Sequence, residues 1–203
     1  MVPSAVLDAC VLCLGSYLRS VVDPATVSRT VASIDDEGLV ERSRQGEFLD
    51  VDRPGLLRRW AQDYRVFSRG RSVALDVPRP ATAIHRLVRE ADTSATFTTS
   101  VALRAWLPED ILRITELSQV VVYTAEVETI DHALRARPVS LARASLLLVT
   151  DAPAPRVAHD DPSWRPIVSV ARAIVDLMSS RGRGAEEAEQ LLTVLAERDP
   201  RWR

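Results

Sequence analysis

The stretch Asp23–Val40, DPATVSRTVASIDDEGLV, decides the fold of the N-terminal part of the chain. Asp23 is a favourable N-cap, and Pro24 suits the first helical position because its missing N–H would have no intrahelical partner there. One apolar stripe comes from three residues spaced by four and three: Val27, Val31 and Ile34. Gly38 is a typical C-terminal stop. The stretch therefore predicts one amphipathic helix followed by the start of a strand.

The neighbouring residues add helices before this stretch and a hairpin after it. Ser4–Leu14 and Ser16–Val22 each predict a short helix. Leu39–Arg42 and Phe48–Val51 have strand-like patterns and are separated by a turn that ends in Gly46. Three helices followed by a hairpin are the element order of a winged helix-turn-helix domain.

A further helix is predicted after the hairpin, opened by Pro54 and spanning Gly55–Tyr64. Four of its larger side chains can share one face: Leu56, Leu57, Trp60 and Tyr64. We interpret it as a packing or connecting helix and not as a surface that stacks on bases.

The polar side of the first quoted helix predicts contact with a DNA major groove. Arg29 carries a planar fork that can pair with guanine O6 and N7, and the N-terminal end of the helix favours phosphate. The expected contacts on the helix are Thr26, Ser28, Arg29 and Ser33, and those on the hairpin wing are Arg42, Arg44 and Gln45. Two alternatives remain: a solvated helix beside an ordinary surface hairpin, and a winged helix that contacts protein.

Charge restricts where a nucleic-acid interface can lie. All 26 basic residues are Arg, so Lys is absent, and Asn is absent too. Because Ala and Val are also abundant, we attribute the Arg richness to a GC-rich genome. The net charge of the 203 residues is −2. Within Arg42–Arg71, however, 8 Arg stand against 4 acidic residues, a local excess of four positive charges. Any nucleic-acid footprint is therefore local and belongs to the first third of the chain.

The two cysteines and the N-terminal apolar run favour a cytoplasmic protein. Cys10 and Cys13 form a single Cys-x-x-Cys pair with no second pair to complete a metal site, so we expect them to pack as small apolar side chains. The uncharged run between Asp8 and Arg19 is shorter than the ~20 residues that span a bilayer. No basic segment precedes it, so a signal peptide is not expected.

The composition of the sequence changes after Tyr64, where a polar stretch and two prolines indicate a domain boundary. Strands are predicted at residues 73–77, 96–98, 120–124 and 145–150, and helices at residues 81–91, 100–107, 127–136, 168–179 and 185–198. Residues 151–162 contain three prolines and are predicted to form a loop. We therefore expect a winged helix-turn-helix domain over residues 1–66, a linker over 67–80, and an α/β domain with a small sheet and flanking helices over 81–203.

The sequence predicts no catalytic centre and no cofactor. His159-Asp160-Asp161 could ligate a metal but falls in the proline-rich loop with no partner cluster, and His85 and His132 stand alone on predicted helices. With only 7 glycines, the chain carries no glycine-rich phosphate loop. We expect the protein not to be an enzyme.

The two closing helices each carry an apolar stripe that is typical of core packing. Among these apolar residues, Asp176 is a polar exception and could pair with Arg172, one helical turn earlier. Near the start of the last helix, we expect three acidic residues to form a solvated face that favours the helix dipole: Glu186, Glu187 and Glu189.

Several blocks together resemble one family. Asp23–Val40, the hairpin, the segment Leu56–Ala61 (LLRRWA), and the closing helices Pro166–Met178 and Gly182–Leu192 resemble AbiEi-type antitoxins of abortive-infection (type IV) toxin–antitoxin systems. The resemblance is clearest at residues 23–64 and 164–192, and the sequence departs from the family pattern before Asp23.

This resemblance implies a winged-helix domain followed by an α/β antitoxin domain. It also implies a repressor that binds repeats in its own promoter, as a monomer or dimer on double-stranded DNA, and that counteracts a partner nucleotidyltransferase toxin. The recognition-helix positions of that family correspond in this chain to Thr26, Ser28 and Arg29. The alternative is a stand-alone winged-helix transcriptional regulator whose C-terminal domain binds a small ligand or a protein partner.

Overall fold

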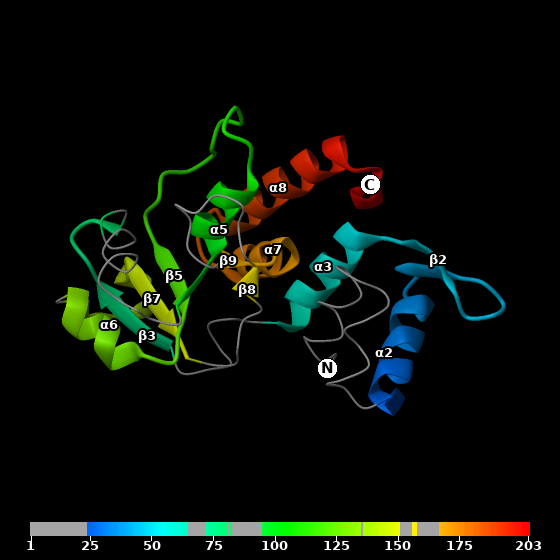
Figure 1. Cartoon of the computed structure of the whole chain (residues 1–203), viewed down its shortest axis with the longest axis horizontal. Coiled ribbons are helices and arrows are strands. Elements are labelled where there is room, and N and C mark those ends of the chain that lie inside the picture. The colour runs from blue at the N-terminus through cyan, green and yellow to red at the C-terminus, as the bar shows by residue number, and fades with distance from the viewer. Residues whose placement is uncertain are drawn as a thin grey trace. The chain divides into compact units, whose positions relative to one another are not determined.

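The computed structural model describes residues 24–64, 72–80, 82, 95–134, 136–150, 156–157 and 167–203 (Figure 1). The helices expected at residues 4–14 and 16–22, the pair Cys10 and Cys13, His85 and His159–Asp161 lie outside the described residues, as does all but residue 82 of the helix expected at 81–91. The chain divides into two compact units, one of residues 1–64 with 192–203 and the other of residues 65–191.

The described part of the first unit begins with a helix and a hairpin, as the sequence predicts. Helix α2, Pro24–Asp36, ends two residues before Gly38. Strand β1, Val40–Arg42, pairs antiparallel with β2, Phe48–Val51. In the connecting turn Gly46 has φ +85°, a left-handed conformation that residues with a side chain rarely adopt.

Helix α3, Arg53–Asp63, follows the hairpin and starts two residues earlier than predicted. The reason is its N-cap, because the Asp52 carboxylate accepts a hydrogen bond from the Gly55 N–H at 2.8 Å. As predicted, the helix serves packing, since three of its side chains are buried: Leu56, Leu57 and Trp60.

The last residues of the chain also belong to this unit and not to the α/β domain in which we expected them. The short helix η2, Pro200–Trp202, contacts α3 and buries Trp202. Arg53 donates from Nη1 to the carbonyl oxygen of Arg201 at 2.7 Å. Apolar burial and a specific hydrogen bond thus hold the C-terminal end against α3.

The second unit is built on a mixed sheet with the strand order β6-β3-β7-β5-β4-β9-β8. Pairings β7–β5 and β4–β9 are parallel, and the other four are antiparallel. The described strands are β3 Ser72–Asp76, β4 Thr96–Thr98, β5 Val120–Tyr123, β6 Arg137–Pro138, β7 Leu146–Val149, β8 Arg156–Val157 and β9 Ile167–Val168. Every residue of the central strands β5 and β7 is buried, as expected where both faces of a sheet are covered.

The sheet corrects three expectations. β3 lies within the expected linker at 67–80, yet it pairs with both β7 and β6 and is part of the sheet. β8 lies within the loop expected at 151–162 and pairs with β9. Val168, expected at the start of a helix, belongs to strand β9 instead. The helix begins later because Ser169 is its N-cap and accepts a hydrogen bond from the Arg172 N–H at 3.3 Å.

The described helices of the second unit are α5 Thr99–Trp106, α6 Val127–Leu134, α7 Val170–Ser179 and the first part of α8 Gly184–Arg198, with the short η1 at Leu141–Arg143. α5 and α7 pack against each other and both contact β4 (Figure 1). Trp106 of α5 donates from Nε1 to the Val168 carbonyl at 3.2 Å and so joins α5 to β9. Together these observations give a mixed α/β protein.

None of the described helices is both long enough and apolar enough to cross a bilayer.

Candidate functional site

Helix α2 buries its apolar side and exposes part of its polar side. Of the predicted stripe, Ile34 is 1% exposed and Val31 is 9% exposed, so both face the core, whereas Val27 is half-buried. On the polar side Ser28 and Arg29 are exposed, whereas Ser33 is half-buried. The side chain of Thr26 lies outside what the structure describes. The candidate contact surface on α2 is therefore its N-terminal half, centred on Ser28 and Arg29.

The turn of the β1–β2 hairpin carries two more of the predicted contacts. Arg44 and Gln45 are both exposed. Ser43 fixes the turn, because its Oγ accepts from the N–H groups of Gln45 at 3.2 Å and Glu47 at 3.1 Å. The carbonyl of Ser43 also accepts from the Gly46 N–H at 2.9 Å. The hairpin thus presents a guanidinium and an amide from a turn with a defined shape.

The third predicted wing residue, Arg42, contacts its own unit. Its Nη1 lies 3.7 Å from Asp35 Oδ2, and its guanidinium carbon lies 5.8 Å from the centroid of the Phe48 ring. Arg42 would have to leave both partners to reach a nucleic acid. The contacts of Arg42 therefore stabilise the hairpin, and they are weaker evidence for a DNA contact by this residue.

Arg59 is one of the arginines of the positive stretch Arg42–Arg71 that pair with acidic side chains. Arg59 forms ion pairs with Glu37 at 2.8 Å and with Asp63 at 2.9 Å. Hydrogen bonds to Asp63 and Glu37 raise the pKa of Arg59. These pairs lie at the C-terminal ends of α2 and α3, so they leave the N-terminal half of α2 and the hairpin turn as the candidate nucleic-acid interface.

A second group of functional candidates is a buried polar network in the second unit. The side chain of Asp176 is fully buried and accepts hydrogen bonds from Thr98 Oγ1 at 2.5 Å and from Tyr123 OH at 3.0 Å. Arg172 pairs with it through Nε at 3.1 Å, as the sequence predicts, and also donates to Tyr123 OH at 2.9 Å.

Burial raises the pKa of Asp176, against the lowering effect of the Arg172 charge and of the donated hydrogen bonds. The network joins α7 to β4 and β5, and each side chain in it is paired with another. None of its four side chains lines the pocket beside the α7–α8 turn or the hollow along residues 104–117. We therefore assign this network to stability rather than to binding.

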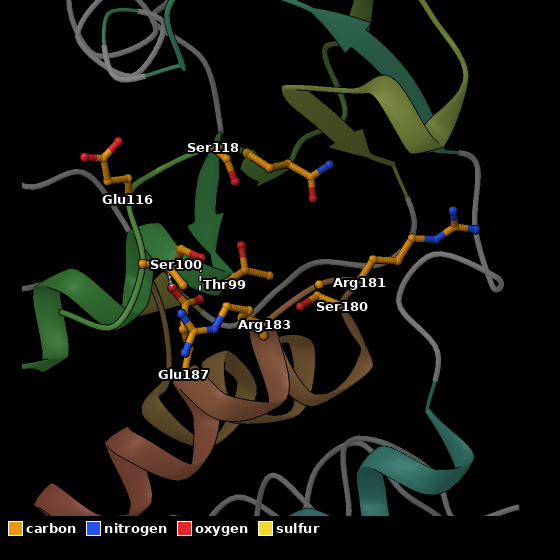
Figure 2. Close-up of a pocket in the computed structure, with 12 residues that line it drawn as sticks. Thr99, Ser100, Glu116, Ser118, Ser180, Arg181, Arg183 and Glu187 are labelled. Atoms are coloured by element: carbon orange, nitrogen blue, oxygen red, sulfur yellow. Dashed lines mark hydrogen bonds between the residues drawn. The ribbon is translucent and has the colours of Figure 1, made fainter.

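A polar pocket lies elsewhere in the second unit and has a volume of about 280 Å³ (Figure 2). Its walls come from the start of α5, from residues 115–119 and from the turn between α7 and α8. The lining residues are Thr99, Ser100, Thr115, Glu116, Ser118, Gln119, Ser180, Arg181, Gly182, Arg183, Gly184 and Glu187. This lining lies within residues 81–203, the C-terminal domain to which the alternative function assigns ligand binding.

The turn between α7 and α8 gives the pocket a defined wall. Gly182 has φ +72° and allows the chain to reverse sharply. At Gly184 a Cβ atom would lie 2.5 Å from the Leu177 carbonyl oxygen, so only glycine fits this close approach. On the opposite wall Thr99 has φ +52°, an uncommon conformation for a residue with a branched side chain. The two glycines of the sequence Arg181–Gly184 (RGRG) are therefore required by the shape of the α7–α8 turn.

Glu187 is buried, which corrects the expectation that it lies on a solvated face with Glu186 and Glu189. Only 4% of Glu187 is exposed, and it accepts a hydrogen bond from Ser100 Oγ at 2.6 Å and another from Thr115 Oγ1. These two hydroxyl groups replace the water that the carboxylate loses. Glu186 and Glu189 are exposed, as expected.

The two arginines of the pocket differ in their pairing. Arg183 donates from Nε to Glu186 at 2.7 Å, and this hydrogen bond raises the pKa of Arg183. Arg181 is exposed and has no ion pair or hydrogen bond with any residue that the structure describes. Figure 2 shows Arg181 and Glu116 on opposite sides of the pocket.

Sequence reasoning missed this pocket. The clue that could have found it is the alternation of Arg and Gly at Arg181–Gly184, between two helices with apolar stripes. The hydroxyl groups of Ser100 and Thr115 gave no clue, because only the fold brings them to Glu187. In the described part of the chain no group of three or more His, Cys, Asp and Glu residues is placed to hold a metal ion.

Comparisons with known proteins find no match to this chain among protein-family models, curated proteins or solved structures.

Proposed function

We propose that the first unit binds double-stranded DNA, with α2 in a major groove and the β1–β2 turn against the backbone or the adjacent minor groove. The observation that carries this proposal is the division of α2, which exposes Ser28 and Arg29 while Val31 and Ile34 are buried. A helix of this kind, followed closely by a hairpin, supports a winged helix-turn-helix domain, whose first two predicted helices fall outside the described residues.

The chemistry of the exposed residues supports base and phosphate contacts. Arg29 lies in the first half of α2, where recognition helices contact base edges. Its guanidinium can pair with both acceptors of a guanine, and Ser28 suits a phosphate oxygen. Arg44 at the hairpin turn adds a cation that can contact phosphate on any sequence.

The resemblance of the sequence to AbiEi-type antitoxins supports a more specific proposal for the biological role. We propose that the protein represses its own operon in the cytoplasm by binding promoter repeats. Its second unit would counteract a nucleotidyltransferase toxin that is encoded next to it, without catalysis by this chain.

A second candidate function is favoured by the polar pocket of the second unit. In this alternative the chain is a transcriptional regulator whose affinity for DNA responds to a small ligand. A change in DNA affinity when the pocket is occupied would favour this candidate, whereas relief of a toxin would favour the first.

The DNA-binding proposal is tested by comparing the promoter fragment upstream of the chain's own gene with random DNA in a fluorescence-anisotropy competition. Arg29→Ala should reduce the preference for the promoter by about 5- to 150-fold, which corresponds to the ~1–3 kcal/mol of a bidentate guanine contact. Arg137→Ala, at an exposed arginine of the second unit, is the matched control. An Arg29→Ala variant that keeps the full preference would contradict the proposed role of α2.

Arg44→Ala tests the hairpin separately. We expect weaker binding to promoter and random DNA alike, with the slope of log Kd against log salt reduced by about 0.9, the contribution of one phosphate contact. A selective loss of promoter binding would place Arg44 at a base edge instead.

The antitoxin role is tested by expressing the neighbouring reading frame with and without the full chain. Relief of toxicity by both the natural chain and Arg29→Ala would assign toxin control to a surface other than α2. Toxicity that persists with the natural chain would refute the antitoxin role.

A further inference from the structure

We propose that the pocket between α5, residues 115–119 and the α7–α8 turn binds a small hydrophilic metabolite that carries a carboxylate or phosphate group together with hydroxyl or amino groups. This site is separate from α2 and the hairpin, and the inference does not depend on DNA binding.

The composition of the lining defines the kind of ligand. All twelve lining residues are polar, charged or glycine, and none has an aliphatic or aromatic side chain. Typical drug-like pockets are largely apolar with a few polar groups, and nucleobase sites use aromatic stacking. The lining therefore favours ligands with polar groups and gives a nucleobase no ring to stack on. The volume of about 280 Å³ suits a molecule no larger than a sugar phosphate.

One side of the pocket can hold an oxyanion. Arg181 has no described partner, and its planar guanidinium matches a carboxylate or phosphate in a bidentate pair. Arg183 stands two residues away on the same turn, and its pair with Glu186 is on the surface, where it can be exchanged for a ligand. The hydroxyl groups of Ser118 and Ser180 are further donors.

The other side of the pocket can accept hydrogen bonds. Glu116 is exposed at the rim. Glu187 accepts from Ser100 and Thr115, and a carboxylate has room for about four such bonds, so acceptor capacity remains. With two arginines and two glutamates the lining is balanced in charge. A ligand with both an oxyanion and hydrogen-bond donors fits this lining better than a bare multivalent anion.

The pocket walls are held in place before any ligand binds. Gly184 fixes the α7–α8 turn against the Leu177 carbonyl. Residues 112–115 are attached to both α5 and α8, because Arg104 donates to the Thr115 carbonyl at 3.1 Å and Gln190 donates to the Leu112 carbonyl at 2.7 Å. A preformed site loses little conformational freedom on binding, which favours specific recognition.

The experiment is a thermal-shift screen of the full chain, followed by calorimetry, with three oxyanion probes and counterparts that lack the oxyanion. Glucose 6-phosphate is paired with glucose, L-serine with ethanolamine, and malate with glycerol. We expect one oxyanion probe to raise the melting temperature while its counterpart does not. Whether the phosphate or a carboxylate probe binds identifies the source of the oxyanion.

Two variants locate the site. Arg181→Ala should weaken binding of the active probe by about 10- to 100-fold, the usual loss for a charge-assisted pair. Ser118→Trp should abolish binding by filling the pocket from an exposed wall position, and Arg137→Ala should leave binding unchanged. The proposal is overturned if no probe binds, if inorganic phosphate binds as well as the active probe, or if Arg181→Ala and Ser118→Trp bind normally.

Discussion

Replacing Asp176 with alanine tests the central packing of the second unit. Asp176 is fully buried and takes hydrogen bonds from Thr98, Tyr123 and Arg172. Its removal takes an ionic partner from the guanidinium of Arg172, which is 8% exposed. Breaking a buried pair in this way costs about 3–5 kcal/mol, because the remaining charge stays out of water.

The expected loss in the free energy of unfolding can be measured by urea unfolding followed by circular dichroism. Thermal unfolding gives a second measure: for a chain of this size each kcal/mol lowers the melting temperature by about 2–4 °C, so Asp176→Ala should melt about 6–20 °C lower than the natural chain. The variant Thr98→Val removes one hydrogen bond and leaves the ion pair, and it should cost only about 1–2 kcal/mol.

A double variant separates the cost of the unpaired charge from the loss of packing. Asp176→Leu with Arg172→Met replaces the pair by apolar side chains, and such replacements are often neutral or stabilising. The double variant should therefore recover at least half of the loss that Asp176→Leu causes alone. The reasoning is refuted if Asp176→Ala costs less than about 1 kcal/mol, or if the two single losses simply add in the double variant.

Further predictions concern pH, a helix cap and two glycines. Because burial raises the pKa of Asp176 above its ordinary value of 3.8, the folded state holds this proton more tightly than the unfolded state. The free energy of unfolding should then decrease as pH rises above about 4, and Asp176→Asn should remove this decrease in urea unfolding at several pH values. Asp52→Ala removes the N-cap of α3 and should lower the free energy of unfolding by about 0.5–2 kcal/mol, whereas Asp52→Ser keeps a capping oxygen and should retain most of that stability. Gly46→Ala places a side chain at φ +85° and should destabilise the hairpin by about 1 kcal/mol, while Gly46→Asn should cost less. Gly184→Ala pushes a Cβ against the Leu177 carbonyl and should lower the melting temperature, whereas an unchanged value would show that the turn adapts freely.

Local patterns were sufficient to predict several elements. The N-terminal proline and the apolar spacing predicted α2, and a glycine turn between two short apolar runs predicted the β1–β2 hairpin. The pair Arg172 and Asp176 could be predicted as well, because two residues four apart on one helix lie on the same face. In each case the decisive interaction joins residues that are close in the sequence.

Features that depend on distant residues could not be predicted in this way. The strand pattern at residues 73–77 predicted β3, but its place in the sheet could not be predicted, because β3 pairs with β7, more than seventy residues later. Trp202 lies near the end of the chain and is buried in the unit that contains α3. Glu187 has the sequence context of a solvated helix start, yet Ser100 and Thr115 come to it from another part of the fold.

The contrast between two buried carboxylates separates binding from stability in the second unit. Asp176 and Glu187 are both almost inaccessible, so burial alone does not distinguish them. Asp176 is enclosed by Thr98, Tyr123 and Arg172, which leaves no space for a ligand atom, whereas Glu187 is held by two hydroxyl groups and adjoins open volume beside Arg183. A neutral amide at each position should therefore act differently. Asp176→Asn should change the pH dependence of unfolding, while Glu187→Gln should chiefly change the affinity of the pocket for a ligand with hydrogen-bond donors.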